Sequence, residues 1–244
     1  MAGAGPELLL AGSSSTAVAA LRRQTTTTPI VFANITDPVG QGVVVSLAHP
    51  GGNVTGFSNY DPQMVGKWLE MLTQLTPPVA HVAALYNPAT TPYAPLSLHA
   101  IEEAAPSLAV VVRAAPVKDD AEIEAAMMSL AREERGGLLV LPDAFTNAHR
   151  DAIVALAARH RLPAVYPFRF FAAAGGLMSY SIDLIDLYRR AAAYVDRILK
   201  GTAPGDLPVQ APVTFKVVVN LKTAKALGLT IRPTLLVAAD EVIE

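Results

Sequence analysis

The sequence has 244 residues, of which 52% are hydrophobic and 16% charged, enough for one large domain or two small ones with a sizeable core. This composition argues against disorder, and a net charge of −2 gives no basic surplus for binding nucleic acid or an anionic membrane surface. Because the chain has no cysteine, disulfides and thiolate metal sites are excluded.

The first part of the chain alternates short apolar runs with helical patterns. In chain order we expect a strand at 7–12, a helix at 14–24, a strand at 28–34, a helix at 37–48 and a strand at 53–58. The short helix at 37–48 is predicted because Pro38 suits the first position of a helix. Pro50, Gly51 and Gly52 then predict a hard turn before the third strand.

The rest of the chain continues the alternation. In order we expect a helix at 62–77, a strand at 81–87, a helix ending near Pro106, a strand at 108–116, a helix at 119–134, a strand at 136–143, a helix at 146–160, strands at 163–168 and 175–181, and a helix at 183–201. Strands that alternate with helices imply parallel pairing through right-handed crossovers. The run GLLVL is apolar on both faces, as a sheet covered by helices on both sides requires.

Two sheets fit this pattern better than one, because about nine strands are near the practical limit of a single open sheet. Breaks between domains are expected near 56–62, 177–181 and 203–215, the last of which is rich in proline. Three crossings would make both domains discontinuous.

No apolar run reaches the roughly 18 residues that span a bilayer, and residues 1–16 lack the basic start and long apolar stretch of a signal peptide.

Common enzyme motifs are absent from the sequence. It contains no P-loop, no complete G-x-G-x-x-G, no G-x-S-x-G and no H-E-x-x-H. We therefore predict no catalytic residue, no metal site and no cofactor.

Polar and aromatic residues instead follow the predicted strands, in the segments GSSST, NITDP, YNPATTPY, PDAFT and YPFRF. In open α/β sheets, ligands bind beyond the carboxyl ends of the strands, where helix N-termini offer free N–H groups to an anion. Two ordinary alternatives stay open at this point. The Ser, Thr and Asp residues are also usual helix caps, and the aromatic residues are also usual in strand cores.

Several segments resemble a known family. PIVFANITDPVGQGVVVSLAHPGGNVTGFSN, KWLEMLTQLTP, the run from LPDAFT to RILKG, and LPVQAPVTFKVVVNLKTAKALGLTI are similar to the substrate-binding proteins of ABC transporters, in the group of tryptophan and tyrosine binders. The resemblance covers nearly the whole chain, and the order of TDPVG, PGGNVTG and NLKTAKALGL is specific to it. It implies a type I periplasmic-binding-protein fold, in which two Rossmann-like lobes enclose a ligand between them.

The resemblance also implies domain boundaries. The first lobe is expected at 1–58 plus 181–212 and the second at 59–180 plus 213–244, with hinges near 57–60, 178–181 and 212–215. Family members usually carry about two more βα units before the segment that matches PELLLAGSSST. The first lobe is therefore expected to be incomplete, and its exposed sheet edge and helix face predict a homodimer.

The implied function is to bind a small amino-acid-like or aromatic carboxylate for an ABC importer, in the periplasm and together with a membrane permease, without enzymatic activity. The residues expected to bind the ligand are Ser14, Ser15 and Thr16 for its anionic group, Thr36 and Asp37 beside them, Asp143 for an ammonium group with Phe145 next to it, and Tyr86 and Tyr166 as aromatic walls. Thr36 and Asp37 are expected at the ligand-facing edge of the first lobe.

Two alternatives remain on the sequence alone. One is a Rossmann-like enzyme such as an isomerase or racemase, although a racemase needs two opposed acid–base groups and no clear pair is present. The other is a ligand sensor that shares the fold but takes no part in transport.

Overall fold

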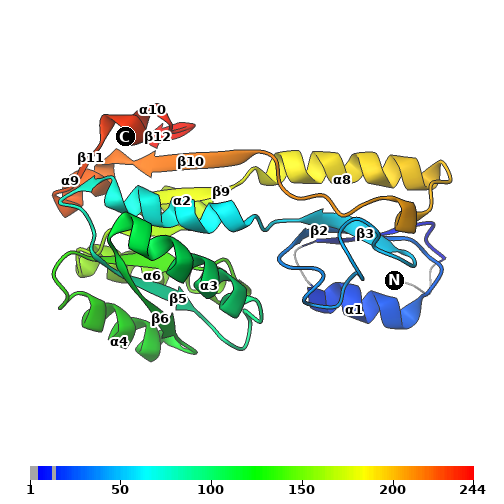
Figure 1. The fold of residues 1–244 in the computed structure, drawn as a ribbon, viewed down its shortest axis with the longest axis horizontal. Helices are drawn as coiled ribbons and strands as arrows, with labels where there is room; N and C mark the ends of the chain where they lie inside the picture. The colour runs from blue at the N-terminus through cyan, green and yellow to red at the C-terminus, as the bar shows by residue number, and fades with distance from the viewer. Residues whose placement is uncertain (1–4, 13–14) are drawn as a thin grey trace. The chain divides into compact units, whose positions relative to one another are not determined.

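The computed structural model describes residues 5–12 and 15–244, and these form two compact α/β units (Figure 1). The first unit comprises the described residues of Met1–Asp61 together with Ile182–Thr214. The second unit comprises Pro62–Ser181 and Phe215–Glu244. The chain therefore passes from one unit to the other three times. The predicted fold class, two α/β units with parallel sheets, is confirmed.

The first unit is built on a parallel three-stranded sheet with the order β1-β2-β3. The strands are β1 (Leu9–Gly12), β2 (Ile30–Ile35) and β3 (Val54–Ser58). The outer side of β3 is covered by the segment around Gln210, whose N–H donates to the carbonyl of Gly56 at 3.0 Å and whose carbonyl accepts from the N–H of Ser58 at 2.8 Å. Among the described residues, the sheet ends on its other side at β1.

Two helices, α1 (Ser15–Gln24) and α8 (Leu184–Leu199), cover this sheet on opposite faces (Figure 1). Val18 of α1 is fully buried in an apolar core with Phe32 of β2. On the other face Tyr194 of α8 lies against Phe57 of β3, with ring centroids 4.8 Å apart. A short 3₁₀ turn, η3 (Pro204–Asp206), completes the unit.

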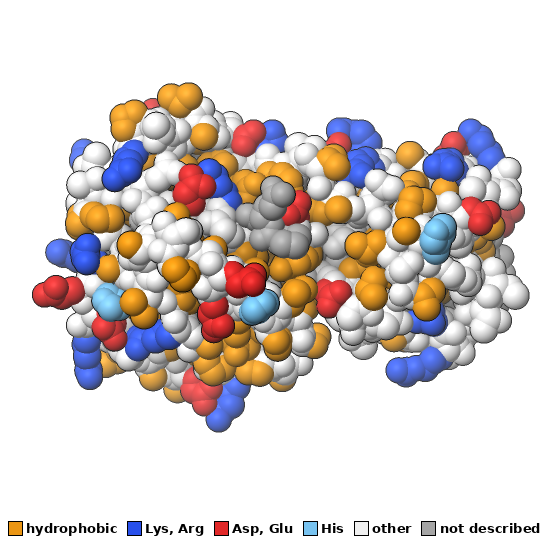
Figure 2. Space-filling view, in the orientation of Figure 1, with side chains coloured by type: hydrophobic (Ala, Val, Ile, Leu, Met, Phe, Trp, Pro, Cys, Tyr) orange, Lys and Arg blue, Asp and Glu red, His pale blue; other side chains and the backbone are white. Residues whose placement is uncertain are grey.

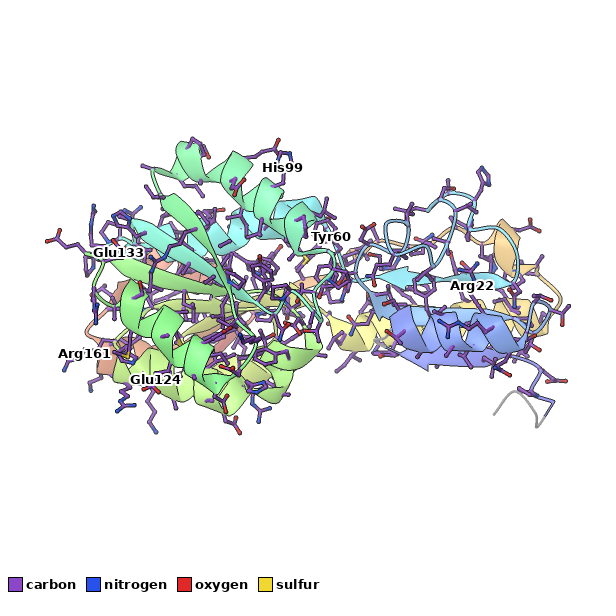
Figure 3. All side chains as sticks on the ribbon, turned by 90° about the horizontal axis from the view of Figure 1, so that it is seen from below. Arg22, Tyr60, His99, Glu124, Glu133 and Arg161 are labelled. Carbon is purple, nitrogen blue, oxygen red and sulfur yellow. The ribbon has the colours of Figure 1, made fainter. Side chains whose placement is uncertain are left out.

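The prediction of a helix at 37–48 is wrong, because the structure has a succession of turns there. Gly42 has a φ of 64°, which an α-helix does not allow. Val43 and Val44 instead insert into the same core as Val18 of α1. Arg22 of α1 holds the turns by donating to the carbonyls of Gly42 at 2.7 Å and Val43 at 3.2 Å (Figure 3).

The second unit is built on a seven-stranded sheet with the order β12-β10-β9-β8-β7-β5-β6. Its strands are β5 (His81–Tyr86), β6 (Val111–Pro116), β7 (Gly136–Val140), β8 (Ala164–Tyr166), β9 (Met178–Ile182), β10 (Phe215–Asn220) and β12 (Glu241–Ile243). Every residue of the inner strand β7 is buried, as the apolar run GLLVL predicts. A separate antiparallel pair joins β4 (Leu75–Thr76) and β11 (Thr230–Ile231).

Helices cover both faces of this sheet (Figure 1). They are α2 (Pro62–Thr73), α3 (Ala94–Ala104) with the 3₁₀ turn η2 (Ala105–Leu108), α4 (Asp120–Leu130), α5 (Ala144–Ala148), α6 (Arg150–Arg159), α7 (Arg169–Ala173), α9 (Leu221–Leu227) and α10 (Pro233–Val237). α2 packs with α3 on one face, and α4 packs with α6 on the other. Trp68 of α2 is buried, and its indole N–H donates to the carbonyl of Tyr180 at 2.8 Å.

Two charged pairs hold the last strand of the second unit. Arg169 donates two hydrogen bonds of 2.6 Å to the carboxylate of Glu241, and this bonding holds the pKa of Glu241 below its ordinary value. Lys216 donates to Asp240 at 2.9 Å.

In the described part of the chain, no helix is both long and apolar enough to cross a membrane.

Candidate functional site

The loop after β2 holds the predicted residue Thr36 in a chain of polar side chains. The Thr36 hydroxyl donates to Oδ1 of Asn59 at 2.7 Å, and Nδ2 of Asn59 donates to Oδ1 of Asn34 at 2.9 Å. Asn59 directly follows β3, so this chain joins the carboxyl ends of two neighbouring parallel strands. A ligand at this edge of the sheet would meet polar groups that are already oriented.

One residue near the end of β2 and one in the loop that follows it have backbone conformations that are uncommon outside glycine. Asn34 has a φ of 62° and Asp37 a φ of 44°. Oδ1 of Asp37 accepts the N–H of Gly40 at 2.9 Å, and a Cβ at residue 40 would lie 1.9 Å from Oδ2 of Asp37. The side-chain amide of Gln41 donates to the carbonyl of Thr36. Strained residues that are held by such bonds are common at binding sites.

Tyr60 lies close to this loop in the first unit (Figure 3). Its hydroxyl is buried and has no hydrogen-bond partner among the described residues. Burial raises the pKa of Tyr60, and the negative charges of Asp37 and Asp61 raise it further. The electrostatic potential at this loop is therefore negative, and a negative potential favours binding of a cationic group over an anionic one.

The predicted anion site after β1 is described only in part. Ser14 lies outside the described residues. Ser15 and Thr16 form the first turn of α1, where Ser15 is half-buried and Thr16 is exposed. These two hydroxyl groups follow a parallel strand, as the sequence predicts, but their role in binding stays a prediction.

In the second unit, Asp143 lies at the carboxyl end of β7 and is buried. Its Oδ1 accepts the hydroxyl of Thr90 at 2.7 Å and the N–H of Phe145 at 2.5 Å, and its Oδ2 accepts the N–H of Asn87 at 3.3 Å. Asp143 therefore caps α5 and at the same time holds the loop that follows β5. Oδ2 accepts one hydrogen bond, the longest of the three, whereas Oδ1 accepts two.

The loops that follow β5 and β7 are further joined by Tyr93, whose hydroxyl donates to the carbonyl of Pro142. Tyr86 is half-buried at the end of β5, and Phe145 is half-buried with its ring stacked on His149 at 4.0 Å. The Thr91 hydroxyl is buried and has no partner in the described part of the chain. Tyr86, Asp143 and Phe145 thus come together at one edge of the second unit.

Tyr166 does not join this group as an exposed wall. Only 1% of the residue is exposed, and its ring stacks on Phe171 with centroids 5.1 Å apart. A Cβ at position 176 would lie 2.6 Å from the Tyr166 ring, so a glycine there allows this packing. The position of Tyr166 is that of a core residue.

The residues that the sequence analysis names individually do not include Asn34, Asn59, Tyr60, Asn87, Thr90 and Thr91, although the segments NITDP and YNPATTPY contain four of them. Asn59, Tyr60 and Asn87 each come within two residues of the end of a strand, which is the signal that could have selected them. Thr90 and Thr91 lie farther along a loop, and only the fold brings Thr90 to Asp143.

Two hollows in the described part of the chain, one beside α2 and one beside the turns at 42–54, are lined by none of the predicted residues. A pocket of about 470 Å³ between α2 and α10 is lined by Lys67, Glu70 and Arg232 among others, but Lys67 and Glu70 already pair at 3.0 Å. Within residues 5–12 and 15–244, no group of three or more His, Asp or Glu side chains is placed to hold a metal ion. The strand ends are therefore the best candidate site.

Comparisons with known proteins show the family to which the chain belongs. A family model described as "ABC transporter substrate binding protein" matches residues 1–243. A tyrosine-binding protein of Clostridioides difficile (strain R20291) is 27% identical over 201 residues, which are 82% of this chain and 57% of that protein. The chain thus spans little more than half the length of this relative.

Two crystal structures are also similar. One is a conserved domain protein from Vibrio cholerae, with 29% identity and a TM-score of 0.87 over 98% of this chain and 79% of the other. The second is an ABC domain in complex with L-Trp from Streptococcus pneumonia, with 28% identity and a TM-score of 0.87 over 99% and 80% of the two chains. A LacI family transcriptional regulator from Bifidobacterium animalis, 13% identical with a TM-score of 0.64, shares the fold alone.

Proposed function

Because the chain belongs to the family of ABC transporter substrate binding proteins, we propose that it captures a small amino-acid-like or aromatic carboxylate for an ABC importer. The observation that carries the proposal is the likeness over nearly the whole chain to a protein crystallised with L-Trp, together with the similarity to a tyrosine-binding protein. The partner is a membrane permease, and the place of action is the periplasm or the cell exterior.

The chemistry of the strand ends supports this ligand class. In the first unit, the negative potential at the loop with Asp37 and Tyr60 suits an ammonium group. The first turn of α1 offers the hydroxyl groups of Ser15 and Thr16 to a carboxylate. In the second unit, Oδ2 of Asp143 is a further acceptor for an ammonium group, and Tyr86 and Phe145 offer apolar surface. Three or four charge-assisted bonds of about 1.5–3 kcal/mol each are sufficient for micromolar binding, roughly 8 kcal/mol, after ordering costs.

The enzyme alternative has less support. A racemase needs two opposed acid–base groups, whereas Asp143 already accepts three hydrogen bonds from its own unit. The sensor alternative has one specific observation in its favour, the shared fold with a LacI family regulator. The homodimer predicted from the sequence stays a proposal as well.

Calorimetry against a panel of tyrosine, tryptophan, their deaminated analogues and neutral sugars tests the ligand class. We expect the two amino acids to bind most tightly. Replacing Thr36 by valine removes the hydroxyl that orients Asn59 and is expected to weaken binding about 5–10-fold, because a typical hydrogen bond contributes about 1 kcal/mol. Thr26→Val, at an exposed position away from the strand ends, is the control. Tighter binding of a sugar than of any amino acid would contradict the proposal.

A further inference from the structure

A pocket of about 470 Å³ lies between α2 and α10 in the second unit (Figure 1). This volume is within the range of about 300–1,000 Å³ that is usual for small-molecule sites. Figure 2 shows basic and acidic side chains close together over α2. The lining of the pocket includes Lys67, Glu70, Gln74, Arg232, Thr234 and Leu235. None of the residues named for the candidate site at the strand ends belongs to this lining.

Local structure fixes two sides of this pocket. Lys67, Glu70 and Gln74 are spaced by three and four residues, which places them on one face of α2 and its last turn. The opposite side follows from the antiparallel pair of β4 and β11. The N–H of Arg232 donates to the carbonyl of Gln74 at 3.1 Å and continues this pairing by one residue. The backbone of Arg232 is therefore held beside the polar face of α2.

The charge of Glu70 is already neutralised within the pocket. Nζ of Lys67 donates to both carboxylate oxygens of Glu70 at 3.0 Å, and Nε2 of Gln74 donates to Oε1 of Glu70 at 2.8 Å. The Thr234 hydroxyl donates to Oε1 of Gln74 at 3.3 Å, so this polar chain reaches α10. The Glu70 carboxylate thus accepts three hydrogen bonds and is paired with a cation, which leaves it little capacity to bind a cationic ligand group.

Arg232 is charged but, unlike Lys67 and Glu70, has no partner for its side chain. The side chain is exposed and forms no hydrogen bond or ion pair with any residue that the structure describes. Two basic residues and one acidic residue line the pocket, so the net charge of the lining is +1. Leu235 is 1% exposed and adds an apolar side chain to the lining. A positively charged pocket with an unpaired guanidinium favours an anion.

We propose that this pocket binds a small carboxylate that has no amino group. The planar guanidinium of Arg232 presents its N–H groups in a fork that matches the two oxygens of a carboxylate. Because Glu70 is paired with Lys67, no unpaired carboxylate is left in the lining to hold an ammonium group. This difference separates the ligand from the amino-acid-like one proposed for the strand ends, and the proposal does not depend on that ligand. Since the guanidinium is exposed and its charge is screened by salt, we expect a dissociation constant on the order of 1 mM.

Benzoate is the probe, and nuclear magnetic resonance of isotope-labelled protein measures its binding. The side-chain amide signals of Gln74 are followed, which restricts the measurement to this pocket. At constant ionic strength, benzoate should shift these signals in a saturable way with a midpoint in the millimolar range, whereas sodium chloride should not. A shift that does not saturate, or that chloride produces equally, would contradict the proposal.

Replacing Arg232 by glutamine removes the guanidinium and is expected to weaken benzoate binding about fivefold or more. Arg132→Gln is the matched control, because Arg132 is also an exposed arginine of the second unit whose side chain has no partner among the described residues. Equal midpoints for these two variants would overturn the proposal. In calorimetry, Arg232→Gln should bind tyrosine as tightly as the unaltered protein does, and a weaker affinity would contradict the separation of the two sites.

Replacing Glu70 by glutamine tests the electrostatic part of the proposal with an expected gain. The change raises the net charge of the lining from +1 to +2, while the new amide oxygen still accepts from Gln74. Benzoate should then bind about threefold more tightly, because the added net charge attracts an anion even through solvent. Circular dichroism checks that the variant keeps its helical content. Unchanged or weaker benzoate binding by a folded Glu70→Gln variant would show that the pocket is not an anion site.

Discussion

Replacing Tyr166 by alanine is expected to lower the free energy of unfolding by about 3–5 kcal/mol, because it empties a fully packed aromatic site in the second unit. The ring stacks on Phe171 and fills the space beside Gly176. Urea denaturation followed by fluorescence or circular dichroism measures the change. Tyr166→Phe keeps the stacked ring and is the matched control, with an expected loss of less than about 1.5 kcal/mol.

The same pair of variants separates a core role from a ligand-wall role. If Tyr166 is a core residue, Tyr166→Phe leaves ligand affinity unchanged, since almost none of the side chain reaches the surface. A stable Tyr166→Ala variant that binds ligand much more weakly would instead show that this ring contacts the ligand, against its position in the structure.

Replacing Asp143 by alanine is expected to cost about 2–4 kcal/mol of stability. The change removes the cap of α5, for which about 0.5–2 kcal/mol is typical. It also leaves the buried N–H of Asn87 without its acceptor, at about 1–3 kcal/mol, and removes the bond to the more exposed Thr90 hydroxyl. Thermal or urea unfolding gives the magnitude. A loss below 0.5 kcal/mol would mean that these bonds do not hold the two loops together.

Asp143→Asn is the informative companion, because the amide oxygen still caps α5 while the negative charge is lost. We expect this variant to remain folded and to bind an amine-bearing ligand more weakly, with less effect on its deaminated analogue. Equal affinities of the variant and the unaltered protein for every ligand in the panel would remove Asp143 from the proposed site.

The alternation of strands and helices could be predicted because it rests on local hydrophobic patterns. The run at 136–143 is apolar on both faces, and β7 (Gly136–Val140) is buried on both faces. The prediction failed at 37–48, where Pro38 suggested the start of a helix, but the positive φ of Gly42 allows turns that place Val43 and Val44 in the core. The helix expected at 146–160 is divided into α5 and α6 at His149, whose ψ of 14° departs from the helical value.

The candidate site could be predicted only in its location. Thr36 and Asp143 follow strands in the sequence, and parallel topology alone brings such residues to one edge of a sheet. Their partners could not be predicted, since Asn59 lies 23 residues from Thr36 and Thr90 lies 53 residues from Asp143. Burial could not be predicted for Tyr166 either, because tyrosine after an apolar run is as common in a core as at a surface.

The most direct test of the central claim is mass spectrometry of the small molecule released from gently purified protein. Binding proteins with micromolar or better affinity often retain their ligand when purification avoids unfolding and long dialysis. The account predicts a molecule that carries both an amino group and a carboxylate, with an aromatic side chain as the first expectation. Release of a neutral sugar, a phosphate ester or a nucleotide as the main bound species would contradict it.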